Sequence, residues 1–151
     1  SHLTWLPDRP YTAGEWGYVN GKGRSTTSEI YNTVDGPVYQ TWMEDITEYK
    51  IDAPAGTYEV ELLMADVSRP ARQQANLLGK GDERASAVSK RFDITICGEV
   101  VEQNFSPADN NRYLNACRRR YIVNNNDGCI DIRFTPLQGK PVLSGLKVRR
   151  L

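Results

Sequence analysis

Several segments alternate apolar and polar residues with a period of two, and this pattern constrains the fold more than any other feature of the chain. The clearest runs are residues 58–64, 92–97 and 129–134. Successive side chains of a β-strand point to opposite faces, so each run predicts a strand with one buried face. The side chains predicted to face the core are Tyr58, Val60, Leu62, Met64, Phe92, Ile94, Ile96, Ile130, Ile132 and Phe134. Weaker patterns predict strands at 38–42, 49–51, 121–123 and 142–148.

Turn-forming residues separate these runs. Segments rich in Pro, Gly, Asn and Asp precede three of the strands, at 53–56, 124–128 and 138–141. Such residues favour turns because they fix or relax the backbone dihedrals that turns require. Residues 70–90 are expected to form a long loop with at most one short helix at 71–78. Together these patterns predict an all-β fold, an antiparallel β-sandwich of the jelly-roll type.

Charge and residue usage exclude several classes of function. The chain has 19 basic and 19 acidic side chains, so it carries no net charge. The run Arg118–Arg120 is the one run of three basic residues, and we interpret it as a solvated strand edge. Nucleic-acid binding is therefore not expected, because it normally needs a basic field. His2 is the single histidine, which excludes Ser-His-Asp and Cys-His catalysis from the expected mechanisms. The odd set Cys97, Cys117 and Cys129 favours packed thiols over a disulfide framework.

The sequence also suggests how this chain relates to a larger protein. Residues 1–2, Ser-His, are expected to be an expression scar. Residues 3–151 are expected to be one β-sandwich domain excised from a longer protein, since this length suits a single domain. No segment approaches the roughly 18 apolar residues of a membrane helix, so no membrane partner is predicted.

The segment 1–37 is rich in aromatic residues and glycines. Its rings are Trp5, Tyr11, Trp16, Tyr18 and Tyr31. Two interpretations remain open at this point. The rings either plug one end of the sandwich, which is the commoner use of aromatic side chains, or form a platform for a ligand.

The order of several motifs resembles that of the malectin domain. The carrying segments are Val38–Trp42 (VYQTW), Tyr58–Val67 (YEVELLMADV), Arg91–Gly98 (RFDITICG), Ile130–Phe134 (IDIRF) and Gly139–Val148 (GKPVLSGLKV). The N-terminal segments Pro7–Tyr11 and Gly14–Tyr18 resemble the start of bacterial members attached to the C-terminus of family 2 glycoside hydrolases such as β-galactosidases. The resemblance covers nearly the whole chain apart from residues 70–90.

This resemblance implies a non-catalytic carbohydrate-binding module of family 57. Its partners would be an oligo- or polysaccharide and a parent catalytic domain in cis, in a periplasmic, cell-surface or secreted bacterial protein. The family's ligand residues are mostly replaced. Ser68 and Arg69 stand where malectin has two aromatic rings, Glu44 stands near a ligand tyrosine, and Gln138–Gly139 stands near a ligand aspartate.

Sugar recognition needs flat apolar rings together with groups that hold hydroxyls. The candidate ligand-binding residues that meet this need are Trp16, Tyr18, Trp42, Glu44, Asp66 and Arg69. Each has a structural alternative: core packing for Trp42, a loop-ordering hydrogen bond for Asp66, and a solvated loop cation for Arg69. The sequence predicts no catalytic residues and no cofactor. The Asx clusters at 109–111 and 124–127 leave a structural calcium open, since calcium binds oxygen ligands.

Two other hypotheses about the function of the domain also remain open. In one, the domain has lost its sugar site and packs structurally on the parent catalytic module. In the other, it is a protein–protein interaction module, which would require a wide exposed apolar patch.

Overall fold

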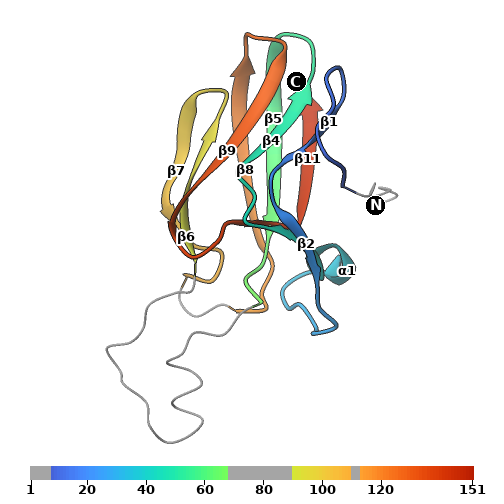
Figure 1. The fold of residues 1–151 in the computed structure, drawn as a ribbon, viewed down its shortest axis with the longest axis vertical. Helices are drawn as coiled ribbons and strands as arrows, with labels where there is room; N and C mark the ends of the chain where they lie inside the picture. Colours follow the sequence, from blue (N-terminus) through green and yellow to red (C-terminus); the bar gives the residue numbers. More distant parts are fainter. Residues whose placement is uncertain (1–7, 68–89, 110–112) are drawn as a thin grey trace, which may run out of the picture.

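The structure, a computed structural model, describes residues 8–67, 90–109 and 113–151. The described part of the chain contains strands and one short helix (Figure 1). Their bounds are β1 Trp16–Val19, β2 Lys22–Ser25, α1 Gly36–Tyr39, β3 Thr41–Glu44, β4 Glu48–Asp52, β5 Gly56–Met64, β6 Arg91–Ile96, β7 Glu99–Phe105, β8 Cys117–Asn125, β9 Cys129–Gln138, β10 Val142–Leu143 and β11 Gly145–Arg150. The predicted loop at 70–90 lies almost entirely outside the described residues.

The strands form two facing sheets and a smaller third sheet. One sheet has the order β1-β4-β9-β6-β7, the sheet packed against it has the order β11-β5-β8, and the third has the order β10-β3-β2. All of the strand pairs are antiparallel. The prediction of an antiparallel β-sandwich is confirmed.

The core forms between the two larger sheets. Every side chain that the alternation assigns to the core is buried, with no more than 4% of its surface exposed. They interlock in one cluster with Tyr49 of β4, Phe105 of β7 and Val123 of β8. The predicted core is therefore confirmed, and burial of these apolar faces is the main force that holds the sheets together.

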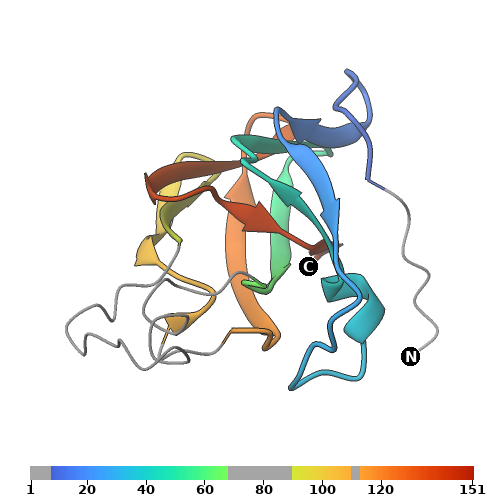
Figure 2. The ribbon, with the colours of Figure 1, turned by 60° about the horizontal axis from the view of Figure 1, so that its bottom comes forward.

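One predicted strand is partly wrong. The strand expected at 38–42 begins at Thr41, because residues 36–39 form α1. Pro37 lies in the first turn of α1, where its fixed φ suits a helix and its missing N–H costs no hydrogen bond. Figures 1 and 2 place α1 beside β2, at the end of the molecule away from β6 and β7.

This placement lets Tyr39 of α1 pack against the reverse face of β5. It forms a second, smaller core cluster with Ile30, Leu63 and Ala65. Leu63 is thus buried on the face of β5 that the period-two pattern leaves to solvent. The far end of β5 is consequently buried on both faces.

Three strands are not predicted by the alternation. β1 and β2 form inside the glycine-rich N-terminal segment, and β7 pairs with β6 across two register shifts. Such irregularities break the period of two, because an extra residue turns the following side chains to the other face.

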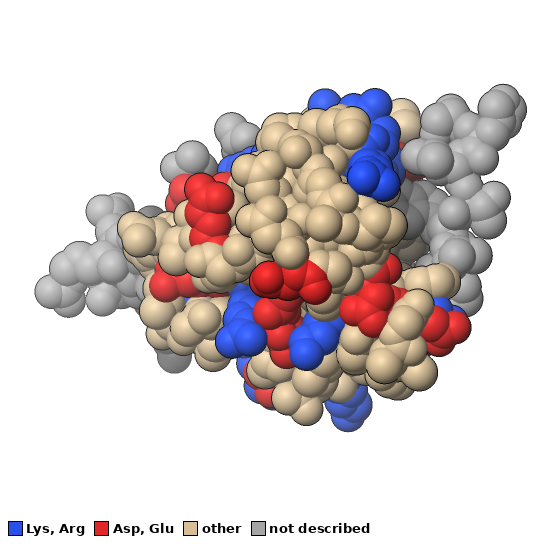
Figure 3. All heavy atoms as spheres, turned by 90° about the horizontal axis from the view of Figure 1, so that it is seen from above, with Lys and Arg blue, Asp and Glu red and all other residues tan. Residues whose placement is uncertain are grey.

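The outer face of the β11-β5-β8 sheet carries charged side chains in cross-strand pairs. Glu59 bridges Arg120 and Arg149, and Glu61 bridges Arg118 and Arg120. Two arginines of the 118–120 run are thus paired with the carboxylates of β5. At the end of the sandwich seen in Figure 3, acidic and basic side chains also lie interspersed.

Within the described residues, no helix is long and apolar enough to cross a membrane.

Candidate functional site

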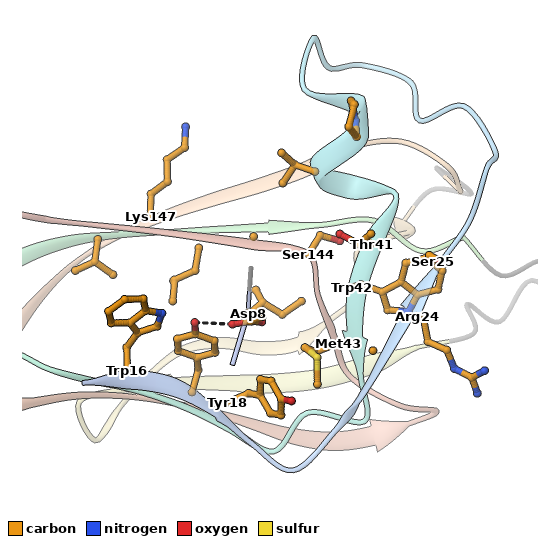
Figure 4. Close-up of a pocket in the computed structure, with 18 of the residues that line it drawn as sticks. Asp8, Trp16, Tyr18, Arg24, Ser25, Thr41, Trp42, Met43, Ser144 and Lys147 are labelled. Atoms are coloured by element: carbon orange, nitrogen blue, oxygen red, sulfur yellow. Dashed lines mark hydrogen bonds between the residues drawn. The ribbon is translucent and has the colours of Figure 1, made fainter. Parts of the chain in front are cut away.

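A groove of about 1300 Å³ opens along one flank of the sandwich (Figure 4). It lies between β1 and β4 on one side and the edge strand β11 on the other, with β2, β3 and α1 at one end. Its lining includes Asp8, Trp16, Tyr18, Arg24, Trp42, Tyr49, Ser144, Leu146 and Val148.

The aromatic wall of the groove follows from strand geometry. Trp16 and Tyr18 are two residues apart on β1, so their side chains share one face. Antiparallel pairing places Tyr18 opposite Tyr49 of β4. On β11, Leu146 and Val148 also share one face and supply the apolar side facing these rings.

Trp42 closes one end of the groove. It lies on β3, directly opposite Arg24 of β2 in the strand register. The Arg24 guanidinium donates to Glu44, two residues beyond Trp42, at an Nε–Oε2 distance of 2.8 Å. Burial raises the pKa of Glu44, but the hydrogen bond and the charge of Arg24 outweigh it and leave the pKa lowered. The pair thus keeps Glu44 ionised and holds Arg24 beside the tryptophan.

A carboxylate that sequence reasoning missed lies at the groove. Asp8 is exposed, and its Oδ1 accepts a hydrogen bond of 2.7 Å from the Tyr49 hydroxyl (Figure 4). Burial and this bond raise the pKa of Tyr49, so Tyr49 remains a donor at neutral pH. The two residues are 41 positions apart, and no sequence pattern links them.

The structure brings together the three rings predicted as ligand residues. Trp16, Tyr18 and Trp42 all line the groove, and all three are half-buried rather than enclosed in the core. One face of the Trp16 ring is already covered, because the Arg9 guanidinium lies 3.6 Å from its centroid. Arg9 also donates a hydrogen bond of 3.3 Å to the Trp16 carbonyl, which fixes the backbone that carries this ring.

Glu44 and Asp66 are not among the described residues that line the groove. Glu44 acts through its bond to Arg24. Asp66 follows β5 and is completely buried, with Lys90 4.0 Å from its carboxylate. Its side chain therefore lies in the interior and does not line the groove. Its carbonyl also accepts the Leu114 N–H at 2.9 Å, consistent with the loop-ordering alternative. Arg69 lies outside the described residues, as does Trp5.

Asp52 anchors the loop that leads into β1. Its Oδ2 accepts hydrogen bonds from the Gly14 N–H at 2.6 Å and the Tyr11 hydroxyl at 2.8 Å. The Gly14 bond and then the Tyr11 bond lower the pKa of Asp52, and the same pairing raises the pKa of Tyr11 to about 12. Since the folded pKa is lowered, this stabilisation is present above the unfolded pKa and is lost as pH falls through the folded pKa.

We expect the Asp52 carboxyl to titrate below its ordinary range, and Tyr11→Phe to move that pKa upward by removing one donor. A carbon-detected NMR titration of the aspartate carboxyls measures both. Tyr31→Phe is the matched control, because Tyr31 is exposed elsewhere on the molecule and should leave the Asp52 titration unchanged. An unshifted Asp52 in the unmodified chain would contradict the anchor.

The described lining of the groove combines apolar walls with a few polar side chains. Among the described lining residues Asp8 is the one carboxylate, whereas glycoside hydrolysis usually needs two flanking the scissile bond. No group of three or more His, Cys, Asp or Glu among the described residues is arranged to hold a metal ion. The three cysteines are half-buried thiols. Apolar walls with a few polar groups are typical of ligand sites.

Comparisons with known proteins find a matching family model and similar solved structures. A sequence model of the malectin domain matches residues 2–145. Bacteroides uniformis β-glucuronidase contains a segment that is 42% identical to this chain and superposes with a TM-score of 0.85. The match covers 100% of this chain but only 16% of that enzyme.

More distant structures share the fold alone. The ANX1 ectodomain from Arabidopsis thaliana is 17% identical, with a TM-score of 0.63 over 97% of this chain and 42% of its own. The plant receptor-like kinase FER is 15% identical, with a TM-score of 0.64 over 94% of this chain and 36% of its own. No curated protein matched.

Proposed function

Because the chain belongs to the malectin domain family, we propose that it is a non-catalytic carbohydrate-binding module. One observation carries the proposal. Trp16 and Tyr18 of β1 and Trp42 of β3 line a single groove, and all three rings are half-buried, so each keeps exposed surface.

The groove offers both kinds of contact that a sugar chain needs. Its rings present flat apolar surfaces for the C–H faces of sugar rings, and Asp8 and Arg24 supply an acceptor and donors for hydroxyls. Ser144 also lines the groove, and its buried hydroxyl has no hydrogen-bond partner among the described residues. Pockets for single small ligands measure about 300–1000 Å³, so this groove suits an oligosaccharide or a polysaccharide segment.

The proposed partner in cis is the catalytic domain of a glycoside hydrolase. The support is the 42% identical segment of the Bacteroides uniformis β-glucuronidase, of which a chain of this length is a small part. In this proposal the parent enzyme carries out the chemistry, and this domain holds the glycan near it. A parent of this kind would work in the periplasm, at the cell surface or outside the cell.

A second candidate function rests on the strand edges. β1 and β11 each have one partner in the described sheets, and both border the groove. Leu146 and Val148 would equally suit an apolar segment of the parent protein. In this alternative the domain is a structural element that packs on the catalytic module and has no sugar site.

We expect Trp42→Ala to weaken glycan binding about tenfold, a loss of about 1.4 kcal/mol, because it removes one of the three stacking surfaces of the groove. Affinity electrophoresis in polysaccharide gels, followed by calorimetry on the best oligosaccharide, measures the change. Tyr31→Ala is the control, because this tyrosine is 53% exposed and does not line the groove.

Binding that is equal for Trp42→Ala and the control would reject the groove as the sugar site. If the chain binds no plant, algal or host polysaccharide, and its deletion destabilises the parent enzyme, the structural alternative is correct.

A further inference from the structure

A second cleft, of about 910 Å³, lies between the loop before α1 and the start of β8. No described residue lines both this cleft and the groove. Its lining is mainly polar: Asn32, Thr33, Tyr39, Ser106, Asp109, Asn115, Arg118 and Arg119, with Val34 and Pro107 among the apolar members. The cleft therefore presents hydroxyl, amide and guanidinium groups, where the groove presents aromatic rings.

The hydroxyl of Tyr39 is the least explained group in this cleft. The side chain is only 1% exposed, and its oxygen has no hydrogen-bond partner among the described residues. A buried hydroxyl without a partner costs about 1–3 kcal/mol, so such groups are normally satisfied by the protein, by ordered water or by a bound ligand. Burial raises the pKa of Tyr39, against the opposing effect of Arg118. The hydroxyl is consequently protonated at neutral pH and available as a donor.

Arg118 supplies further donors at the same place. Its guanidinium lies beside the Tyr39 hydroxyl and lowers the pKa of that group against the larger effect of burial. The Nε atom contacts Glu61 at 3.1 Å, but Nη2 reaches Asp35 only at 3.9 Å, beyond hydrogen-bond distance. The terminal nitrogens thus keep donor capacity toward the cleft, and the side chain is 42% exposed.

The neighbouring arginine is already committed. Arg119 donates to the carbonyl of Arg118 at 3.2 Å, contacts Glu102 at 3.7 Å, and lies over the Phe105 ring. Asp109 adds a negative charge to the lining. Together with Glu61 and Asp35 beside Arg118, this carboxylate disfavours a doubly charged sulfate or phosphate in the cleft.

From this convergence of donors we propose that the second cleft binds the carboxylate of an acidic sugar, a uronate residue of a glycan. One carboxylate oxygen would accept from the Tyr39 hydroxyl and the other from the Arg118 guanidinium. The amides of Asn32 and Asn115 line the same cleft and suit the ring hydroxyls. The proposal rests on the proposed function only in taking a glycan as the ligand.

The test titrates the 151-residue chain with glucuronate at pH 7, followed by two-dimensional NMR and calorimetry. We expect shifts in residues that line the cleft, weaker binding of glucose, which lacks the carboxylate, and weaker binding of acetate, which lacks the ring. Tyr39→Phe should weaken glucuronate binding about tenfold, the value of one buried hydrogen bond to a charged group. Because an unpaired buried hydroxyl is destabilising, this variant should unfold at the same midpoint as the original chain or at a higher one.

Trp42→Ala is the control that separates the two sites. It should leave glucuronate binding in the cleft unchanged while it weakens polysaccharide binding in the groove. Acetate binding as tightly as glucuronate would overturn the uronate assignment, and so would glucuronate binding that is unaffected by Tyr39→Phe. If groove binding fails but the cleft responds as expected, the failure lies in the proposed groove and the cleft assignment stands.

Discussion

Replacing Phe92 with alanine is expected to lower the free energy of unfolding by about 3–5 kcal/mol. Phe92 is completely buried on β6, between β9 and β7 of the five-stranded sheet. Its ring meets Phe105 at a centroid distance of 5.6 Å and Phe134 at 6.1 Å, both in edge-to-face geometry. The substitution therefore leaves a cavity and also removes two favourable aromatic contacts. A loss of this size is a large part of the roughly 5–15 kcal/mol that stabilises a typical domain.

Chemical denaturation monitored by tryptophan fluorescence measures this loss. Leu137→Ala is the matched control, because Leu137 lies on β9 in the same sheet but is 55% exposed. It should change the unfolding free energy by less than about 0.5 kcal/mol. If the two variants unfold at the same denaturant concentration, the packing of the core is not as described.

Replacing Gly17 with alanine is expected to abolish glycan binding in the groove and to cost about 1–3 kcal/mol of stability. A Cβ at this position would lie 2.4 Å from backbone atoms of residues 9–11. Real side chains do not tolerate such distances, so either β1 or the 9–11 segment must move. Movement of β1 displaces Trp16 and Tyr18, and movement of the segment displaces Asp8. Either response takes apart one wall of the groove.

The control for this substitution is Gly36→Ala, where an added Cβ meets no atom within 4 Å. Binding to the best polysaccharide from the gel assay, measured by calorimetry, distinguishes the two variants. Circular dichroism should show that both retain the β-sheet signal, because Gly17 lies at the edge of the five-stranded sheet. Unchanged binding in Gly17→Ala would show that the close contact between β1 and residues 9–11 does not shape the site.

The groove and the cleft offer different kinds of contact to a ligand. The groove presents aromatic rings from β1 and β3, whereas the cleft presents the polar groups of Tyr39 on α1 and Arg118 on β8. If both proposals hold, one domain contacts a glycan through apolar stacking at one place and through a carboxylate at another. Binding at two places raises the overall affinity of a long polymer without requiring either site to be strong.

The sequence alone was sufficient to predict the β-sandwich and the side chains that form its core. The alternation in segments such as 58–64 reports directly which side chains avoid water, and it does so without knowledge of any partner strand. It was less reliable where the backbone departs from a regular pleat. Pro37 starts a helix inside a predicted strand, and the register shifts of β7 hide its inward face.

The sequence also named Trp16, Tyr18 and Trp42 as candidate ligand residues, and all three line the groove. That Trp16, Tyr18 and Trp42 share a groove was decided only by the tertiary structure, and so were the contribution of Asp8 and the burial of Asp66. The physical reason is that alternation is a local property of the chain. Convergence depends on strand order and register, which are set by pairing between segments far apart in the sequence.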